Sequence, residues 1–387
     1  MPPIPKILLL LESARTCERN FARGIARYAR LHGPWTFYRK PQFYFKTNRK
    51  GISPAQIKNL APDGIIVSDT EDVEMILQLD KPTLIHTFQT DQYDRPVIIG
   101  DTQQTGKMGA EHLMGLGFVH FAYCGIGDYY WSRGRCASFQ QTLARAGYSA
   151  ACFELNPVRM KTALQKELSR LTQWLSGLPV PVGLMTCADD CSQYIVEACT
   201  LANLNIPEAI AVIGVDNDEM ICELSDPPLS SVSLDFAAAG YQAAELLERI
   251  ISGQSVPREP ITVCPTHIEV RASTNILAID DADVAKAVRF IRQHAWQSIQ
   301  VADVLNEVAC CRRRLHEKFV TIIGHSVHQE IRRVRIERIS KLLRETDLTI
   351  TQIALKMEFF NTNHLSRYYK HATGLNPLAY RKRFGVK

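Results

Sequence analysis

Short apolar runs alternate with amphipathic stretches from residue 6 to about residue 236. The runs that predict strands are KILLLL, GIIVSD, PTLIHTF, VIIGD, VHFAYCGIG, VGLMTC and AVIGVDN. Amphipathic segments such as TGKMGAEHLMGLG and YQAAELLERII place their apolar residues at helical spacing. Apolar strands in alternation with such helices indicate parallel sheets covered by helices. The pattern therefore predicts a two-lobed, doubly wound α/β domain over residues 1–275.

The pattern becomes purely helical in the last hundred residues. Residues 272–283, ASTNILAIDDAD, carry no strong periodicity, so we expect a linker at 276–283 and an all-α domain at 284–387. The same pair of helices is predicted twice in this domain, as in two helix-turn-helix motifs, over residues 301–308, 312–322, 350–357 and 362–371. A helix predicted at 327–344 joins the pairs and would be roughly 27 Å long. Because successive major-groove faces of B-DNA lie roughly 34 Å apart, one chain could place two helices on one side of a duplex.

The overall charge of +5 conceals two oppositely charged parts of the chain. Residues 283–387 hold 20 Lys and Arg against 9 Asp and Glu, a net charge of +11, and the remaining residues have a net charge of −6. Surplus Lys and Arg neutralise phosphates, and Arg and Asn side chains can bond to guanine and adenine edges. A run of charge is more often a solvated helix face. Its repetition on two helix pairs favours binding to double-stranded DNA.

The last hundred residues resemble the DNA-binding domain of AraC-type transcription regulators. The likeness is carried by IRRVRIERISKLL, LTITQIAL and TGLNPLAYR, with Pro377 and Tyr380 in the closing pattern. It implies that each helix-turn-helix motif has a recognition helix, here called a reading helix, whose outward positions contact DNA. These positions are Arg312, Arg313, His316 and Glu317 in the first reading helix and Thr362, Asn363 and Arg367 in the second.

Three positions depart from the pattern of that family. Glu358 and Ala309 stand where it usually has turn glycines, and Cys311 stands where it usually has an N-cap serine. Since a non-glycine residue adopts φ > 0 only at a cost, we expect one or both turns to be altered.

Polar residues gather at the carboxyl ends of the predicted strands, where ligands bind in doubly wound sheets. They are Glu12, Ser13, Asp69, Asp128, Asp189 and Asp216, with Arg19, Trp131 and Arg135 in adjacent loops. Carboxylate acceptors, forked guanidinium donors and a flat ring suit a polyhydroxylated sugar. An Asp at a strand end also often caps the next helix, and this simpler explanation stays open for Asp69, Asp101 and Asp128.

Residues 6 to about 275 resemble the sensor domain of LacI-type regulators, a periplasmic-binding-protein fold with two lobes hinged over a small ligand. The likeness is carried by IAVIGVDNDE, LSSVSLDFAAAGYQAAELLERII and CPTHIEVRAST. It implies that Asp189 and Asp216 bind the ligand, and we add Ser13, Arg19, Trp131 and Arg135 to the predicted site. Leu234 stands where many relatives have a glutamine, so one hydrogen bond to the ligand would be missing.

A LacI-type sensor in front of an AraC-type reader resembles the arrangement in bacterial xylose-operon activators of the AraC/XylS family. This resemblance implies D-xylose as inducer, a homodimer formed through the sensor domain, a DNA operator and activation of sugar-catabolic genes, with RNA polymerase as a further partner. Arabinose or ribose in place of xylose stays open.

Other functions find less support in the sequence. Gly125 and Gly127 lack the third glycine of a dinucleotide loop, and neither GxxxxGK[ST] nor GxSxG occurs, so we expect neither an enzyme nor a cofactor. Eleven scattered cysteines predict reduced thiols and no metal site. The apolar run after Lys6 is too short for a signal sequence or a membrane span. We therefore expect a cytoplasmic protein rather than an exported sugar receptor.

Overall fold

The computed structural model describes residues 4–12, 14–39, 52–70, 73–256, 259–276 and 281–384. The chain divides into two compact units, one made of residues 1–111 and 120–275 and the other of residues 112–119 and 276–387. We call the first the sensor unit and residues 281–384 of the second the helical unit. Within the predicted linker at 276–283, residues 277–280 lie outside the described residues, and 282–283 already belong to a helix.

The described part of the sensor unit contains two six-stranded sheets. The first has the order β11-β5-β4-β3-β1-β2, with all pairings parallel. Its strands are β1 Lys6–Leu10, β2 Thr36–Arg39, β3 Gly64–Ser68, β4 Thr83–His86, β5 Val97–Gly100 and β11 Ile261–Val263. The second has the order β12-β10-β9-β8-β6-β7 and is parallel except for β10 and β12. Its strands are β6 His120–Ile126, β7 Ala150–Leu155, β8 Val182–Thr186, β9 Ile210–Val215, β10 Ser230–Leu234 and β12 Pro265–Glu269.

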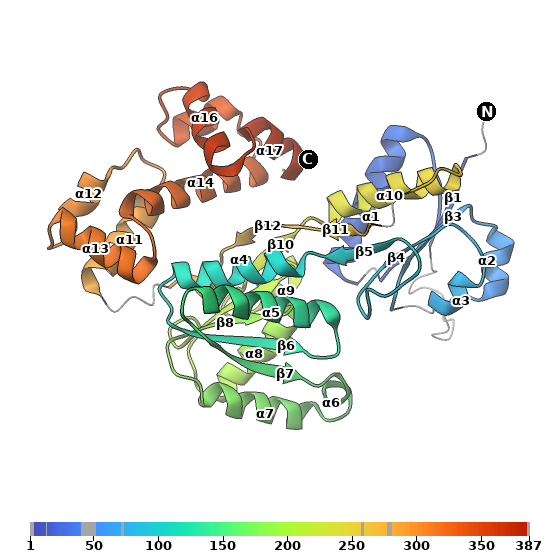
Figure 1. The fold of residues 1–387 in the computed structure, drawn as a ribbon, viewed down its shortest axis with the longest axis horizontal. Helices are drawn as coiled ribbons and strands as arrows, with labels where there is room; N and C mark the ends of the chain where they lie inside the picture. The colour runs from blue at the N-terminus through green and yellow to red at the C-terminus, as the bar shows by residue number, and fades with distance from the viewer. Residues whose placement is uncertain are drawn as a thin grey trace. The chain divides into compact units, whose positions relative to one another are not determined.

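Each sheet forms the centre of one lobe. Strands β3, β8 and β9 are buried along their whole length, as expected for parallel strands covered on both faces. In the described chain the backbone passes from one sheet to the other three times, after β5, after β10 and after β11. The predicted two-lobed, doubly wound α/β fold is therefore confirmed (Figure 1).

Helices cover both sheets of the sensor unit. Those of the first lobe are α1 Thr16–His32, α2 Pro54–Leu60, α3 Val73–Leu77 and α10 Phe236–Ile251. Those of the second lobe are α4 Thr102–Gly115, α5 Tyr130–Arg145, α6 Pro157–Thr162, α7 Leu164–Ser176, α8 Asp189–Leu201 and α9 Glu219–Leu224, followed by a 3₁₀ turn at Ala272–Thr274.

Helices α1 and α10 cross at unusually short range because each presents a glycine to the other (Figure 1). A Cβ atom added at Gly24 would lie 2.0 Å from the carbonyl oxygen of Ala237, and one added at Gly240 would lie 2.0 Å from that of Phe21. This crossing joins the amino-terminal helix of the first lobe to a helix that enters the lobe more than 200 residues later.

The helical unit consists of helices in the described residues. They are α11 Ala282–His294, α12 Val301–Asn306, α13 Arg312–Ile323, α14 Val327–Glu345, α15 Ile350–Lys356, α16 Thr362–Thr373 and α17 Pro377–Phe384. Helices α12 and α13 form the first predicted helix pair, and α15 and α16 form the second. Helix α14 joins them and is one residue longer than predicted.

Each helix pair has its own apolar core. The first core includes Leu315 and Phe319 of α13 with Ile331 of α14. The second includes Leu365 and Tyr369 of α16, again with a residue of α14, Leu343. We call each helix pair with its core a module. Because α14 contributes to both cores, it holds the two modules in one helical unit.

The close crossing of α1 and α10 predicts that Gly24→Ala destabilises the sensor unit by about 1–3 kcal/mol, since the added methyl group overlaps a backbone carbonyl that cannot easily move. Urea denaturation followed by circular dichroism measures the change. Gly115→Ala is the control, because its methyl group would meet open space at the end of α4 and should be neutral or slightly stabilising. Equal stability of Gly24→Ala and the unmodified chain would contradict the close crossing.

Candidate functional site

A narrow cavity of about 40 Å³ lies between the two lobes of the sensor unit. The cavity is lined from both lobes, by Arg15, His86, Thr87, Phe88, Gly100, Tyr130, Trp131, Arg135, Ala188, Asp216, Leu234, Phe236 and Val263. Most of these residues directly follow a strand or begin the next helix, as expected at the carboxyl ends of parallel strands. The volume suffices for a few water molecules.

Arg135 of α5 is the central donor of the cavity. Its Nη2 lies 3.7 Å from Oδ1 of Asp216, its Nη1 donates to the carbonyl of Cys187, and its guanidinium lies 5.0 Å from the ring centre of Trp131. Its Nε is buried without a hydrogen-bond partner among the described residues. A buried donor of this kind is costly unless a bound molecule supplies an acceptor.

The first turn of α5 also connects the two lobes. Trp131 Nε1 donates to the carbonyl of Phe88 at 2.9 Å, and the hydroxyl groups of Tyr130 and Thr87 lie 2.7 Å apart. Thr87 and Phe88 follow strand β4 of the opposite lobe, and the amide of Phe88 donates to Asp69 at 2.7 Å. Asp69 therefore holds the loop that meets α5.

The first lobe contributes an apolar wall with a buried polar pair behind it. His86 stacks on Phe21 with ring centres 4.9 Å apart and lies 4.5 Å from Phe88. Its Nδ1 is 3.4 Å from Oε1 of Glu18, and both side chains are almost fully buried. Arg15 covers the outer face of Phe88 at 5.3 Å. Aromatic rings beside polar groups suit the C–H face of a sugar.

Asp216 reaches the cavity from a strained loop after β9. Asp216 and Asn217 have φ values of 102° and 50°, which are uncommon for non-glycine residues. Asp189, which is fully buried, holds this loop: its carboxylate accepts from the amide of Asp218 at 2.8 Å and from the hydroxyl of Ser231 at 2.7 Å. Burial, together with the nearby Asp216, raises the pKa of Asp189 to about 8. Burial also raises the pKa of Asp216, against the opposing effect of Arg135 and Arg15.

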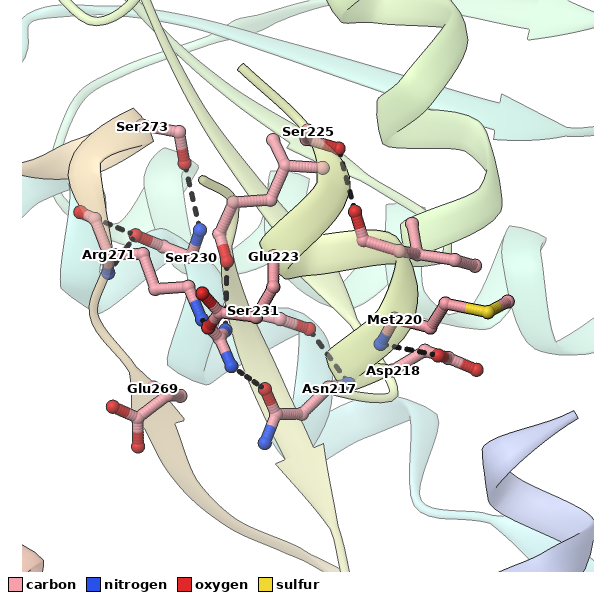
Figure 2. Close-up of polar contacts among 12 residues, drawn as sticks. Asn217, Asp218, Met220, Glu223, Ser225, Ser230, Ser231, Glu269, Arg271 and Ser273 are labelled. Carbon is pink, nitrogen blue, oxygen red and sulfur yellow. Dashed lines mark hydrogen bonds and ion pairs between the residues drawn. The ribbon is translucent and has the colours of Figure 1, made fainter. Parts of the chain in front are cut away.

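The same loop is bonded to the end of the sensor unit through Arg271. Figure 2 shows this guanidinium between Asn217 and Glu223, with Nη2 2.9 Å from Oδ1 of Asn217 and Nε 2.6 Å from Oε1 of Glu223. The amide of Arg271 donates to Ser230 Oγ at 2.8 Å, and the amide of Ser230 donates to Ser273 Oγ at 2.8 Å. These bonds connect the cavity loop to the last residues before 276.

The structure brings together three of the predicted sugar-site residues, Trp131, Arg135 and Asp216. Asp189 lies behind Asp216 and supports its loop instead of lining the cavity. Arg19 is exposed on α1, where it donates to Ala14 and Thr16, and it is not among the lining residues. Ser13 lies outside the described residues.

Sequence reasoning missed Arg15, His86, Phe88 and Phe236. The rule that located Asp216 could have found His86 and Phe88, because they end or follow strand β4. The predicted set contains polar residues and a single aromatic ring, Trp131, whereas several apolar rings form much of the wall. The simpler explanation holds for Asp101, which accepts from the amide of Gln104 at 2.8 Å in the first turn of α4.

The predicted DNA-contact residues of α13 are exposed. They are Arg312, Arg313, His316 and Glu317. Arg313 and Glu317 form an ion pair, with Nε and Oε1 2.9 Å apart. The buried positions of the helix, Leu315 and Phe319, face the first core.

Helix α16 has the same division between a buried and an exposed face. Asn363 and Arg367 are exposed and Thr362 is partly buried, while Leu365 and Tyr369 belong to the second core. The preceding Asn361 caps the helix and accepts from the amide of His364 at 2.8 Å.

The three departures from the expected turn pattern have different outcomes. Glu358 has a φ of 53°, so it adopts the left-handed conformation that glycine favours. Ala309 is not among the described residues with positive φ, so the first turn follows another path. Cys311 occupies the N-cap of α13 and makes no capping hydrogen bond with its side chain.

Two segments of the chain match known kinds of domain. Residues 110–274 match the periplasmic binding protein-like domain, and residues 304–383 match a helix-turn-helix domain. The chain combines a periplasmic binding protein-like domain with a helix-turn-helix domain. The expected two-part organisation of the fold is thereby confirmed.

Several relatives align with almost the whole chain. The xylose operon regulatory protein of Haemophilus influenzae is 29% identical, over 97% of this chain and 98% of its own. That of Escherichia coli strain K12 is 27% identical, over 97% and 96%. The solved structure of a xylose-binding transcription activator covers 100% of both chains with 25% identity and a TM-score of 0.60. The lac repressor dimer bound to operator shares the fold over 72% of this chain, with a TM-score of 0.53.

None of the described helices has the length and apolarity needed to cross a bilayer. Within the same residues there is no group of three or more His, Cys, Asp or Glu that could hold a metal ion.

The pKa of Asp189 predicts a specific dependence of stability on pH. The unfolded chain loses this proton near pH 4, whereas the folded chain keeps it until about pH 8. Folding therefore binds a proton in this range, and stability falls as the pH rises through it. Asp189→Asn removes the titration. The unfolding free energy of the unmodified chain, relative to that of the variant, should fall between pH 5 and 8 by up to about 1.4 kcal/mol per pH unit. Urea denaturation measures both free energies. If they change with pH in parallel, Asp189 is ionised in the folded chain.

The uncapped start of α13 predicts that Cys311→Ser stabilises this helix by about 1 kcal/mol, because serine can accept a hydrogen bond from the first turn. Hydrogen–deuterium exchange of the α13 amides should slow about fivefold. Asn361→Ala is the matched control in the second module, where removal of an existing cap should speed exchange in α16 by a similar factor. If neither variant changes exchange, these helix ends are held by other contacts.

Proposed function

We propose that the chain is a sugar-responsive DNA-binding transcription regulator, and that it activates xylose-utilisation genes. Its sensor unit binds D-xylose in the interlobe cavity, and helices α13 and α16 bind double-stranded DNA. The observation that carries the proposal is the cavity itself. There Arg135 has a buried Nε without a hydrogen-bond partner and places its Nη2 3.7 Å from the carboxylate of Asp216, in a chain that also carries two basic reading helices. The names of the full-length relatives support the choice of sugar.

The chemistry of the cavity suits a pentose. The Asp216 carboxylate accepts hydrogen bonds from hydroxyl groups, and the Arg135 guanidinium donates to hydroxyl oxygens. The rings of Trp131, Phe88 and Phe236 offer apolar faces for the C–H groups of the sugar. Leu234 also lines the cavity. It stands where many relatives have a glutamine, and its side chain can contribute no hydrogen bond to the sugar.

The contacts between the lobes suggest how a sugar would act. A pentose needs more room than the cavity offers, so the lobes or the lining side chains must move when it enters. A hydroxyl bonded to Asp216 acts on the loop that Asp189 and Arg271 hold. Arg271 lies four residues before the end of the sensor unit. The sugar thereby favours one arrangement of the loop and of the chain that leaves the unit. The switch is the difference between its affinities for this arrangement and for the alternative one.

The charges and exposed residues of the helical unit support DNA binding. The net charge of +11 over residues 283–387 attracts the phosphate backbone and makes the affinity fall with salt. The exposed Arg312, Arg313, Asn363 and Arg367 can reach base edges from the two reading helices. The proposal includes a homodimer and contact with RNA polymerase, as expected for an activator.

The proposal is tested with the full-length chain in two measurements. Calorimetry should give measurable binding of D-xylose and weaker binding of L-arabinose and D-ribose. Asp216→Asn should weaken xylose binding about tenfold or more, because a charged acceptor contributes roughly 1.5–3 kcal/mol. Arg19→Ala, at an exposed position outside the lining, should change it less than twofold.

The second measurement is a nuclease footprint of the chain on DNA from the neighbourhood of xylose genes. D-xylose should change the strength or extent of the footprint, and Asp216→Asn should shift this response to higher sugar concentrations. A footprint unaffected by any of the three sugars would refute the coupling. Preference for arabinose or ribose would keep the regulator and replace its inducer.

A further inference from the structure

Two adjacent phenylalanines before α16 have opposite environments. Phe359 is 7% exposed, and its ring contacts Arg335 at 4.9 Å, His364 at 5.3 Å and Tyr368 at 5.2 Å. Phe360 is 91% exposed, which makes it the most exposed large hydrophobic side chain of the described residues. Single exposed apolar residues are common at protein surfaces. The position and the rigid setting of Phe360 distinguish it from such residues.

The outward direction of Phe360 is fixed by the turn between α15 and α16. Glu358 adopts the left-handed conformation at φ 53°, which costs a non-glycine residue of the order of 1 kcal/mol. The amide of Phe359 donates to Ala354 at 2.8 Å, and Oε2 of Glu358 accepts from the amide of Ser298 in the first module at 2.9 Å. With Phe359 anchored in the core on one side and Asn361 capping α16 on the other, Phe360 has little freedom to turn inward.

Phe360 stands at the amino-terminal end of the second reading helix. In helix-turn-helix proteins this end of the helix approaches the base edges in the major groove. Asn361 uses its side-chain oxygen for the helix cap. Phe360 is therefore an exposed apolar side chain at the start of the helix that carries the exposed polar residues Asn363 and Arg367.

We propose that Phe360 makes an apolar contact with the C5-methyl group of a thymine and thereby contributes to the sequence preference of the second module. The methyl group of thymine is the apolar group that the major groove presents to a protein side chain. The contact removes both the ring and the methyl group from water. This inference rests on the proposed DNA binding and adds to it one residue and one base.

The experiment removes only the methyl group. Duplexes are first selected from a random pool with the full-length chain in the presence of D-xylose. Each thymine of the selected duplex is then replaced singly by uracil, which keeps the hydrogen-bonding edge and lacks the methyl group. We expect the affinity of the unmodified chain to fall about three- to fivefold at one thymine, as for the loss of one buried methyl group.

Phe360→Ala should bind the parent duplex correspondingly more weakly and should no longer distinguish thymine from uracil at that position. Phe360→Leu, which keeps an apolar side chain, should keep part of the difference. Leu355→Ala is the control: Leu355 is another exposed apolar residue, at 72%, on α15, and its removal should leave the thymine–uracil difference unchanged. Since both altered side chains, Phe360 and Leu355, are exposed, we expect the three variants to fold.

Different failures have different meanings. If Phe360→Ala shows the same thymine–uracil differences as the unmodified chain at every position, the contact does not exist. If its DNA binding is unchanged and only transcription falls, Phe360 serves a protein partner, and the inference is overturned. If the unmodified chain enriches no duplex, the proposed DNA-binding function fails, and this inference fails with it.

Discussion

The buried carboxyl group of Asp189 is the interaction on which the sensor site depends. It fixes the amide of Asp218 and the hydroxyl of Ser231, and so holds the loop after β9 in a conformation that non-glycine residues rarely adopt. Without this support, the strained conformation that places Asp216 opposite Arg135 would not be favoured. A group with no place in the cavity lining thus determines the geometry of the cavity. Strain at such a site persists only where the surroundings impose it.

The helical unit depends on a different constraint, the sharing of α14 between two cores. Ile331 packs in the first core and Leu343 in the second, so neither module can rotate about this helix without disturbing its own packing. A buried ionic group reinforces the first half of α14. Although burial opposes it, hydrogen bonds from Arg333 and His325 lower the pKa of Glu330 to about 2. Removal of both partners would leave an uncompensated buried charge, which is strongly destabilising in general.

Much of the fold could be predicted from the sequence, because burial on both faces of a strand requires continuous apolar runs and a helix face requires its own spacing. The strands around GIIVSD and AVIGVDN and the helix at 327–344 follow from these requirements alone. Less of the candidate site could be predicted from the sequence. A sequence places Asp189 and Asp216 at strand ends, but it does not tell which carboxylate faces the cavity and which supports the loop behind it. Arg15 and Arg19 lie one helical turn apart, and only the three-dimensional path of the chain decides which of them lines the cavity. The missing glycines predict an altered path in one or both turns. Ala309 avoids the left-handed conformation, whereas Glu358 adopts it in spite of its side chain, and the sequence does not distinguish these two outcomes.

The three passages of the chain between the sheets have a mechanical consequence. Three covalent connections side by side resist twisting and sliding of the lobes, and they bend together most easily about a common axis. The relative motion of the lobes then reduces to a single angle of opening. Under the proposed function, a ligand in the cleft would act on the rest of the protein through that one coordinate, so ligands of different shape would have the same effect if they held the same angle.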